Sequence, residues 1–105
     1  MDAKRFQEIA ERLGWNVEIN GHHIDLQRYS PEGQDCQFSI RADGTLVEEA
    51  YRLYEYYDPS EETMMWVDSS GHGKNGAPYH LKDILADMEA VEEMLRTLYL
   101  EILND

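Results

Sequence analysis

The 105-residue chain is poor in cysteine, in proline and in basic residues: it has one cysteine, three prolines and nine Lys and Arg. Cys36 alone cannot form an intramolecular disulfide, so we expect a hydrophobic core to hold the fold, as in proteins of the reducing cytosol. The nine bases face 22 Asp and Glu, and the net charge is −13. This charge argues against direct binding to nucleic acid or to an anionic membrane, because both need a basic face.

Long hydrophobic runs are also missing. No stretch approaches the ~18–20 apolar residues of a transmembrane helix, and the charged N-terminal residues do not form a secretory signal peptide. We therefore expect a cytoplasmic protein. Hydrophobic residues make up 42% of the chain, which is too many for a disordered acidic tail. The length predicts one domain that spans residues 1–105.

The first segment, Asp2–Leu13, has the pattern of an amphipathic helix. Asp2 is a suitable N-cap, and Gly14 follows the last turn, where a left-handed residue is common. The apolar residues that recur at helical spacing are Phe6, Ile9, Ala10 and Leu13. We expect this helix to pack its apolar stripe on a sheet.

Three strands follow, with apolar and polar residues in alternation. The first is Trp15–Ile19, the second is His22–Tyr29, and the third is marked by Cys36, Phe38 and Ile40. Asn20-Gly21 predicts a type I′ hairpin turn between the first two strands. A second turn is predicted around Pro31. The alternation predicts a three-stranded antiparallel meander with one apolar face.

Helices account for the rest of the chain. The predicted elements are a helix Leu46–Tyr57 capped by Thr45, a break at Asp58-Pro59, a short helix from Ser60 through Val67, a loop Ser69–Gly76 and a long helix His80–Leu103. The predicted fold class is therefore α+β. The expected order is one helix, the meander, and then two or three helices packed on one face of the sheet.

We find no pattern for a catalytic, cofactor or metal site. The soft metal ligands are His22, His23, His72, His80 and Cys36. They lack the spacings of zinc sites, and adjacent histidines on a strand point to opposite faces. The glycine-rich loop lacks the register of a phosphate-binding loop, and no serine has the Gly-x-Ser-x-Gly context. Cys36 has the parity of the core face, where a thiol is usually inert.

The acidic residues are the outlier of this sequence. Residues 1–44 have a net charge of −3, and residues 45–105 have a net charge of −10. Like charges at i,i+4 on a helix cost ~0.2–0.5 kcal/mol per pair, so such rows add nothing to stability. They suit a surface that meets a basic one, with carboxylates in the place of phosphates. The predicted partner-binding residues are Glu48, Glu49, Glu55, Asp58, Glu61, Glu62, Asp83, Asp87, Glu89 and Glu93.

Two other functions stay open at this point. The acidity could serve solubility only, in a homo-oligomeric structural or regulatory module. Leu100, Met94 and Tyr99 would then lie near a contact between two copies, because they fall beside the apolar stripe of the last helix. The third reading is a small metal- or thiol-dependent enzyme.

Four stretches also resemble a known group of proteins. They are Tyr29–Cys36, Tyr57-Asp58-Pro59, Trp66 before a glycine-rich loop with Pro78, and Leu85–Leu95. The chain resembles, over about residues 24–103, small uncharacterised acidic proteins carried on conjugative and other mobile elements of gut bacteria, often beside antirestriction proteins. Such relatives usually have an aromatic residue where this chain has Cys36.

The expected architecture and charge are also similar to those of small acidic anti-CRISPR proteins. Some of these act as DNA mimics that occupy the duplex-binding cleft of a nuclease. The first group has no established function to carry over, and the second likeness favours the mimicry that the charge of residues 45–105 suggests. We therefore expect a non-enzymatic, acidic inhibitor that binds the basic nucleic-acid site of a host defence protein, with no cofactor.

Overall fold

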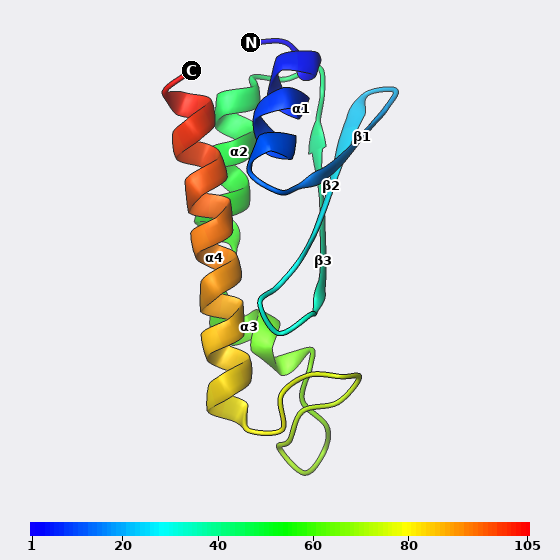
Figure 1. Ribbon diagram of the computed structural model, residues 1–105, viewed down its shortest axis with the longest axis vertical. Helices are drawn as coiled ribbons and strands as arrows, with labels where there is room; N and C mark the ends of the chain where they lie inside the picture. Colours follow the sequence, from blue (N-terminus) through cyan, green and yellow to red (C-terminus); the bar gives the residue numbers. More distant parts are fainter.

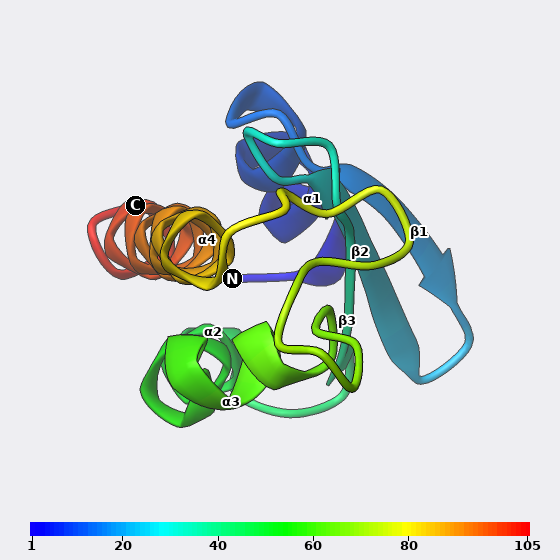
Figure 2. The ribbon, with the colours of Figure 1, turned by 90° about the horizontal axis from the view of Figure 1, so that it is seen from below.

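The computed structural model describes all residues 1–105 and has the predicted order of elements (Figure 1). Its elements are α1 (Ala3–Arg12), β1 (Asn16–Asn20), β2 (His23–Tyr29), β3 (Asp35–Arg41), α2 (Leu46–Tyr56), α3 (Pro59–Met64) and α4 (Leu81–Leu103). The sheet is antiparallel with the order β1-β2-β3, and the fold is mixed α+β as predicted. All four helices lie on one side of the sheet (Figure 2).

The register of the sheet places its apolar residues on one face. Val17 pairs with Leu26 and Leu26 pairs with Phe38, so alternate positions along all three strands share that face. The helices lie over this face, and no element covers the other one (Figure 2). By the register, the polar residues that alternate with the apolar ones face that uncovered side. The parity predicted from the sequence is confirmed.

The core lies between this sheet face and the helices. It is contributed by α1, the sheet, α2 and above all α4, whose stripe supplies Met88, Val91, Leu95, Leu98 and Ile102. These five side chains are at most 2% exposed. Burial of one such side chain stabilises the fold by about 1.5–3 kcal/mol, so α4 is the main apolar support of the sheet.

Three details of the prediction are wrong. The two-residue hairpin loop is Gly21-His22, because Asn20 pairs with His23, and only Gly21 has positive φ, at 60°. A glycine at the first central position is typical of a type II′ turn. The turn therefore lies one residue later than predicted, because the pairing of Asn20 with His23 sets the register of the hairpin. Thr45 precedes α2, but its side chain makes no cap hydrogen bond.

The third wrong detail concerns α3, which is shorter than predicted and begins earlier. Its N-cap is Asp58, whose carboxylate accepts the N–H of Ser60 at 3.0 Å, and Pro59 occupies the first turn. Proline fits there because the first N–H groups of a helix have no intrahelical partner. The helix ends at Met64, so Val67 lies outside it and forms an isolated bridge with Gly73.

The molecule is elongated, with dimensions of 45 × 24 × 21 Å. Helix α4 has 23 residues and runs along most of the length (Figure 1). No helix combines the length and the apolar character that a membrane span requires. Helices α2, α3 and α4 lie on the side of the molecule away from the uncovered face of the sheet (Figure 2).

Candidate protein-binding surface

Most of the ten predicted partner-binding acids are exposed on the helical side of the molecule. The exposed ones are Glu48 and Glu55 on α2, Asp58 and Glu61 at α3, and Asp83, Glu89 and Glu93 on α4. Glu89 and Glu93 are four residues apart, so they point outward from the same face of α4. We call the seven exposed carboxylates the acidic helical surface.

Asp87 does not belong to this surface, and its prediction as a partner-binding residue is wrong. It is only 4% exposed. One carboxylate oxygen accepts the Ser30 hydroxyl at 2.6 Å, and the other accepts the backbone N–H of Glu32 at 3.0 Å. The Ser30 hydroxyl in turn accepts the N–H of Gln34 at 2.8 Å. Asp87 therefore holds the β2–β3 turn against α4.

The Glu49 carboxylate also makes most of its contacts within the protein. Its side chain is 12% exposed, and one carboxylate oxygen accepts the backbone N–H of Arg41 at 2.7 Å. The other oxygen pairs with Arg52 at 3.1 Å. This carboxylate covers an edge N–H of β3 and ties the first turn of α2 to the sheet.

Glu62 is half-buried and has neither a hydrogen-bond donor nor a cation beside it among the hydrogen bonds and ion pairs of the protein. Burial raises the pKa of this carboxyl, and the neighbouring charges of Glu61 and Asp58 raise it further. Among the ten predicted residues, Glu62 is the one that is both partly buried and without a hydrogen-bond donor or a cation.

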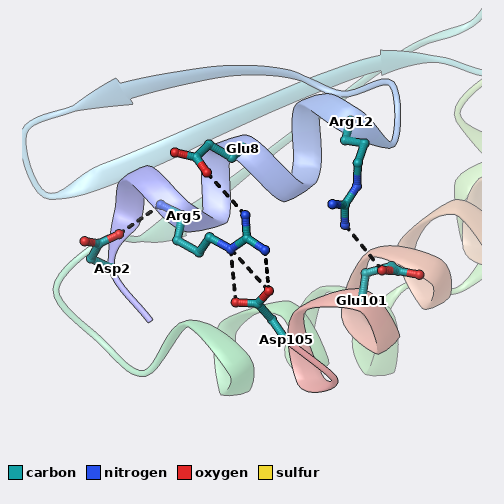
Figure 3. Close-up of polar contacts among 6 residues, drawn as sticks. All are labelled: Asp2, Arg5, Glu8, Arg12, Glu101 and Asp105. Carbon is teal, nitrogen blue, oxygen red and sulfur yellow. Dashed lines mark hydrogen bonds and ion pairs between the residues drawn. The ribbon is translucent and has the colours of Figure 1, made fainter.

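Two arginines of α1 are paired with acids at the end of α4. Arg5 of α1 contacts both Glu8 and Asp105, with its closest approach to Asp105 at 2.6 Å, and Arg12 reaches Glu101 at 3.5 Å (Figure 3). Two arginines of α1 thereby neutralise the C-terminal end of α4. Because of Arg5, the pKa of Asp105 lies below its usual value.

The helical half has few cations of its own. Arg52 pairs with Glu49 and lies 4.0 Å from Glu48, and Arg96 lies 3.8 Å from Glu93. Lys74 and Lys82 are in no ion pair. Five members of the acidic helical surface consequently have no cation within ion-pair distance: Glu55, Asp58, Glu61, Asp83 and Glu89.

The residues predicted for a contact between two copies are less accessible than expected. Met94 and Tyr99 are half-buried and pack against the core. The Tyr99 ring stacks with Tyr54 and lies 5.2 Å from Tyr51, centroid to centroid. Leu100 is half-buried as well. Tyr99 thus fills the contact between α2 and α4 within one chain.

The thiol and the histidines form no cluster suited to a metal ion: no group of three or more His, Cys, Asp or Glu side chains has the required arrangement. Cys36 is buried, as its parity predicted, and burial raises its pKa to about 11. The thiolate, which is the reactive form, is therefore scarce at neutral pH. His72 stacks on Tyr79, with ring centroids 4.0 Å apart.

Sequence reasoning missed the structural roles of Asp87 and Glu49. A signal for Asp87 was present, because it lies three residues after Ile84 and four before Val91, which are both buried. That spacing places its side chain beside the core stripe of the helix. Glu49 had the same signal, because it lies three residues after the buried Leu46 and four before Leu53, which packs against the core. Its partner could not be foreseen, since that contact depends on the distance between the start of α2 and the end of β3.

Comparison with known proteins adds no relative. No protein-family model, curated protein or solved structure matches the chain. The arguments for function therefore rest on the residues and the fold.

Proposed function

We propose that the protein is a non-enzymatic, acidic binding protein of a bacterial mobile element that acts in the cytoplasm. In this proposal its acidic helical surface occupies the basic nucleic-acid-binding site of a host defence protein, such as a nuclease, and so competes with nucleic acid. Three features of the sequence and fold support it: the excess of acids, their concentration on helices at one side of the sheet, and the five exposed carboxylates there that have no cation.

The observation that carries the proposal is the set of exposed carboxylates without a cation on α2, α3 and α4. Solubility of a small domain normally needs a net charge of only about 2–8 in magnitude. This chain has −13, and residues 45–105 alone contribute −10. Four arginines pair with acids of residues 45–105, yet five carboxylates of the acidic helical surface keep no cation beside them.

The proposal is tested by capture followed by competition. The tagged protein is incubated with a lysate of gut bacteria, and bound proteins are eluted either with salt or with duplex DNA and identified by mass spectrometry. We expect a nucleic-acid-binding protein that duplex DNA releases. The purified partner should then lose its DNA binding or nuclease activity when this protein is added.

Two charge-matched variants locate the interaction. The first neutralises Glu55, Glu61 and Glu89 to Gln on the helical side. The control neutralises Glu11, Glu18 and Glu32 to Gln; these acids are exposed, make no ion pair and lie in the N-terminal half. Inhibition should fall at least tenfold in the first variant and stay within about twofold in the control. Equal loss in both, or no DNA-sensitive partner, would refute mimicry.

A further inference from the structure

Strand β3 has one unpaired edge. The N–H of Ala42 donates to the carbonyl of His22 at 2.7 Å, and the N–H of Ser30 donates to the carbonyl of Gln34 at 2.8 Å. Even-numbered residues of β3 therefore bond to β2, and the backbone groups of odd-numbered residues point away from it. No strand follows on that side, so the N–H groups of Gln37 and Ser39 are available for a further strand.

The fold covers only one end of this edge. The outward N–H of Arg41 is bound by the Glu49 carboxylate. Asp35, Gln37 and Ser39 remain exposed. An open strand edge is a template for pairing with another chain, and proteins usually blunt it with proline, lysine or a covering element. None of these lies along Asp35–Ser39.

Two cavities adjoin this edge on the helical side of the sheet. One, of about 390 Å³, is lined mainly by apolar side chains that include Cys36, Phe38, Tyr57, Met65 and Trp66. The other, of about 270 Å³, continues toward α2 along Ile40 and Leu53. Both share Phe38, Tyr57 and Glu62. We call them together the β3 groove.

Large apolar side chains are exposed beside the groove. Met65, which lines it, is 65% exposed, and Tyr56 is 80% exposed. Side chains of this kind anchor interfaces, because aromatics and methionine bury much area on binding. An apolar groove alongside free backbone donors is the arrangement by which proteins bind an extended peptide as an added strand.

The charges around the groove select a basic occupant. Asp35 is exposed on the edge with no cation beside it, on the face where alternate side chains of an added strand would lie, and the whole chain has a net charge of −13. The cations at the edge, Arg41 and Arg52, are already paired with Asp43 and Glu49. A second copy of this chain would bring a further −13, so self-pairing through β3 is opposed by charge.

We propose that the free edge of β3 binds an extended peptide segment of a partner, in which apolar side chains alternate with Lys or Arg. The alternation follows from the pleat, since successive side chains of an added strand point to opposite faces. The apolar ones enter the β3 groove toward Tyr57 and Trp66, and the basic ones lie near Asp35. This site is independent of the acidic helical surface and of the function proposed above.

The test is a titration of the full chain with a labelled octapeptide of four Lys-Val repeats, followed by fluorescence anisotropy. A Glu-Val octapeptide controls for charge, and a Lys-Val octapeptide with alternate backbone nitrogens methylated controls for strand pairing. We expect binding of the first peptide and at least tenfold weaker binding of both controls. In amide exchange, the N–H groups of Gln37 and Ser39 should become protected by the first peptide only.

Two variants at one position separate strand pairing from charge. Ser39→Pro removes an outward N–H, a change that edge strands tolerate, and Ser39→Thr keeps it. Affinity should fall at least tenfold in the first and stay within twofold in the second, with the melting curves showing that both fold. Should Ser39→Pro fail to fold, the methylated peptide on the unaltered protein gives the same test.

Three outcomes would overturn the proposal. The first is equal binding of the methylated and unmethylated peptides. The second is loss of binding in the Glu55, Glu61 and Glu89 variant but not in Ser39→Pro, which would assign the peptide to the acidic helical surface. The third is a dimer in sedimentation that Ser39→Pro dissociates, which would make a second copy the occupant.

Discussion

Residues 1–44 carry eight acids and five bases, whereas residues 45–105 carry 14 acids and four bases. In the first region each arginine has a partner: Arg5, Arg12 and Arg41 are in ion pairs, and Arg28 lies over the Trp15 ring at 5.8 Å. In the second region most exposed carboxylates have no cation. Exposed carboxylates without a cation are thus more numerous in the second region, and those of the first include Glu11, Glu18 and Glu32.

The comparison teaches that acidity and availability are separate properties. Asp87 and Glu49 belong to the acid-rich helices, yet both are bound to backbone groups near the sheet. Glu89 lies on the same helix as Asp87 and faces solvent. Substitution of these neighbours should therefore have opposite effects on stability, and the three predictions below use this contrast.

The largest effect is expected at the carboxylate that joins the two regions. Asp87→Ala removes the acceptor for the Ser30 hydroxyl and the Glu32 N–H, and it leaves these groups without their partner beside α4. Hydrogen bonds to a charged group contribute about 1.5–3 kcal/mol, and we expect a loss of this size in the free energy of unfolding. Urea denaturation measures it.

The control for Asp87 is Asp83→Ala, one turn earlier on α4. Asp83 is exposed and in no ion pair, so its removal should change the free energy of unfolding by less than about 0.5 kcal/mol. If Asp83→Ala destabilised the protein as much as Asp87→Ala, the burial of Asp87 would not be the cause.

A smaller effect is expected from the ion pair between α1 and the end of α4 (Figure 3). Arg5 lowers the pKa of Asp105 in the folded protein. The stabilisation is therefore present above the ordinary Asp pKa of ~3.9 and is lost as the pH falls through the lower, folded value. Arg5→Ala should lower the melting temperature slightly at pH 6.

The melting temperatures of Arg5→Ala and of the unaltered protein should become equal at low pH. As the pH falls through the lowered pKa of Asp105, the unaltered protein loses the ion pair that Arg5→Ala already lacks, so the two melting temperatures should come together. A difference that stayed constant from pH 6 to pH 2 would show that Arg5 acts through packing and not through its charge.

The smallest effect has the opposite sign. Glu89 and Glu93 repel each other one turn apart, so Glu89→Gln should raise the free energy of unfolding by about 0.2–0.5 kcal/mol. The gain should vanish at about 1 M salt, where the Debye length is ~3 Å. A loss of stability in Glu89→Gln, measured by the same urea denaturation, would mean that this carboxylate has a role within the fold.

Much of the fold follows from periodicity. The helix around Phe6, the three strands and the stripe of α4 are all marked by apolar spacing, and each lies within a residue or two of its predicted bounds. The hairpin turn was misplaced because both Asn20-Gly21 and Gly21-His22 satisfy local turn chemistry. The pairing of Asn20 with His23 decides between these two turns, and that pairing cannot be read from the local sequence.

The candidate surface was harder to predict than the fold. Composition gave the excess of acids, and helical spacing gave their faces. Neither signal revealed that the Asp87 carboxylate accepts a hydrogen bond from Ser30, because 57 residues separate the two in the sequence. The β3 groove escaped notice for the same reason, since Phe38 and Trp66 lie in different elements and only the packing of α3 brings them together.

The most direct test of the central claim is the salt dependence of partner binding. Once a DNA-sensitive partner is isolated, the logarithm of its Kd is plotted against the logarithm of salt concentration for three proteins: the unaltered chain, the Glu55, Glu61 and Glu89 variant, and the Glu11, Glu18 and Glu32 control. When a carboxylate that contacts the partner is replaced by Gln, fewer counterions are released on binding. The slope should therefore become shallower in the Glu55, Glu61 and Glu89 variant only. The same slope in both variants would contradict the account and leave the acidity as a general property of the molecule.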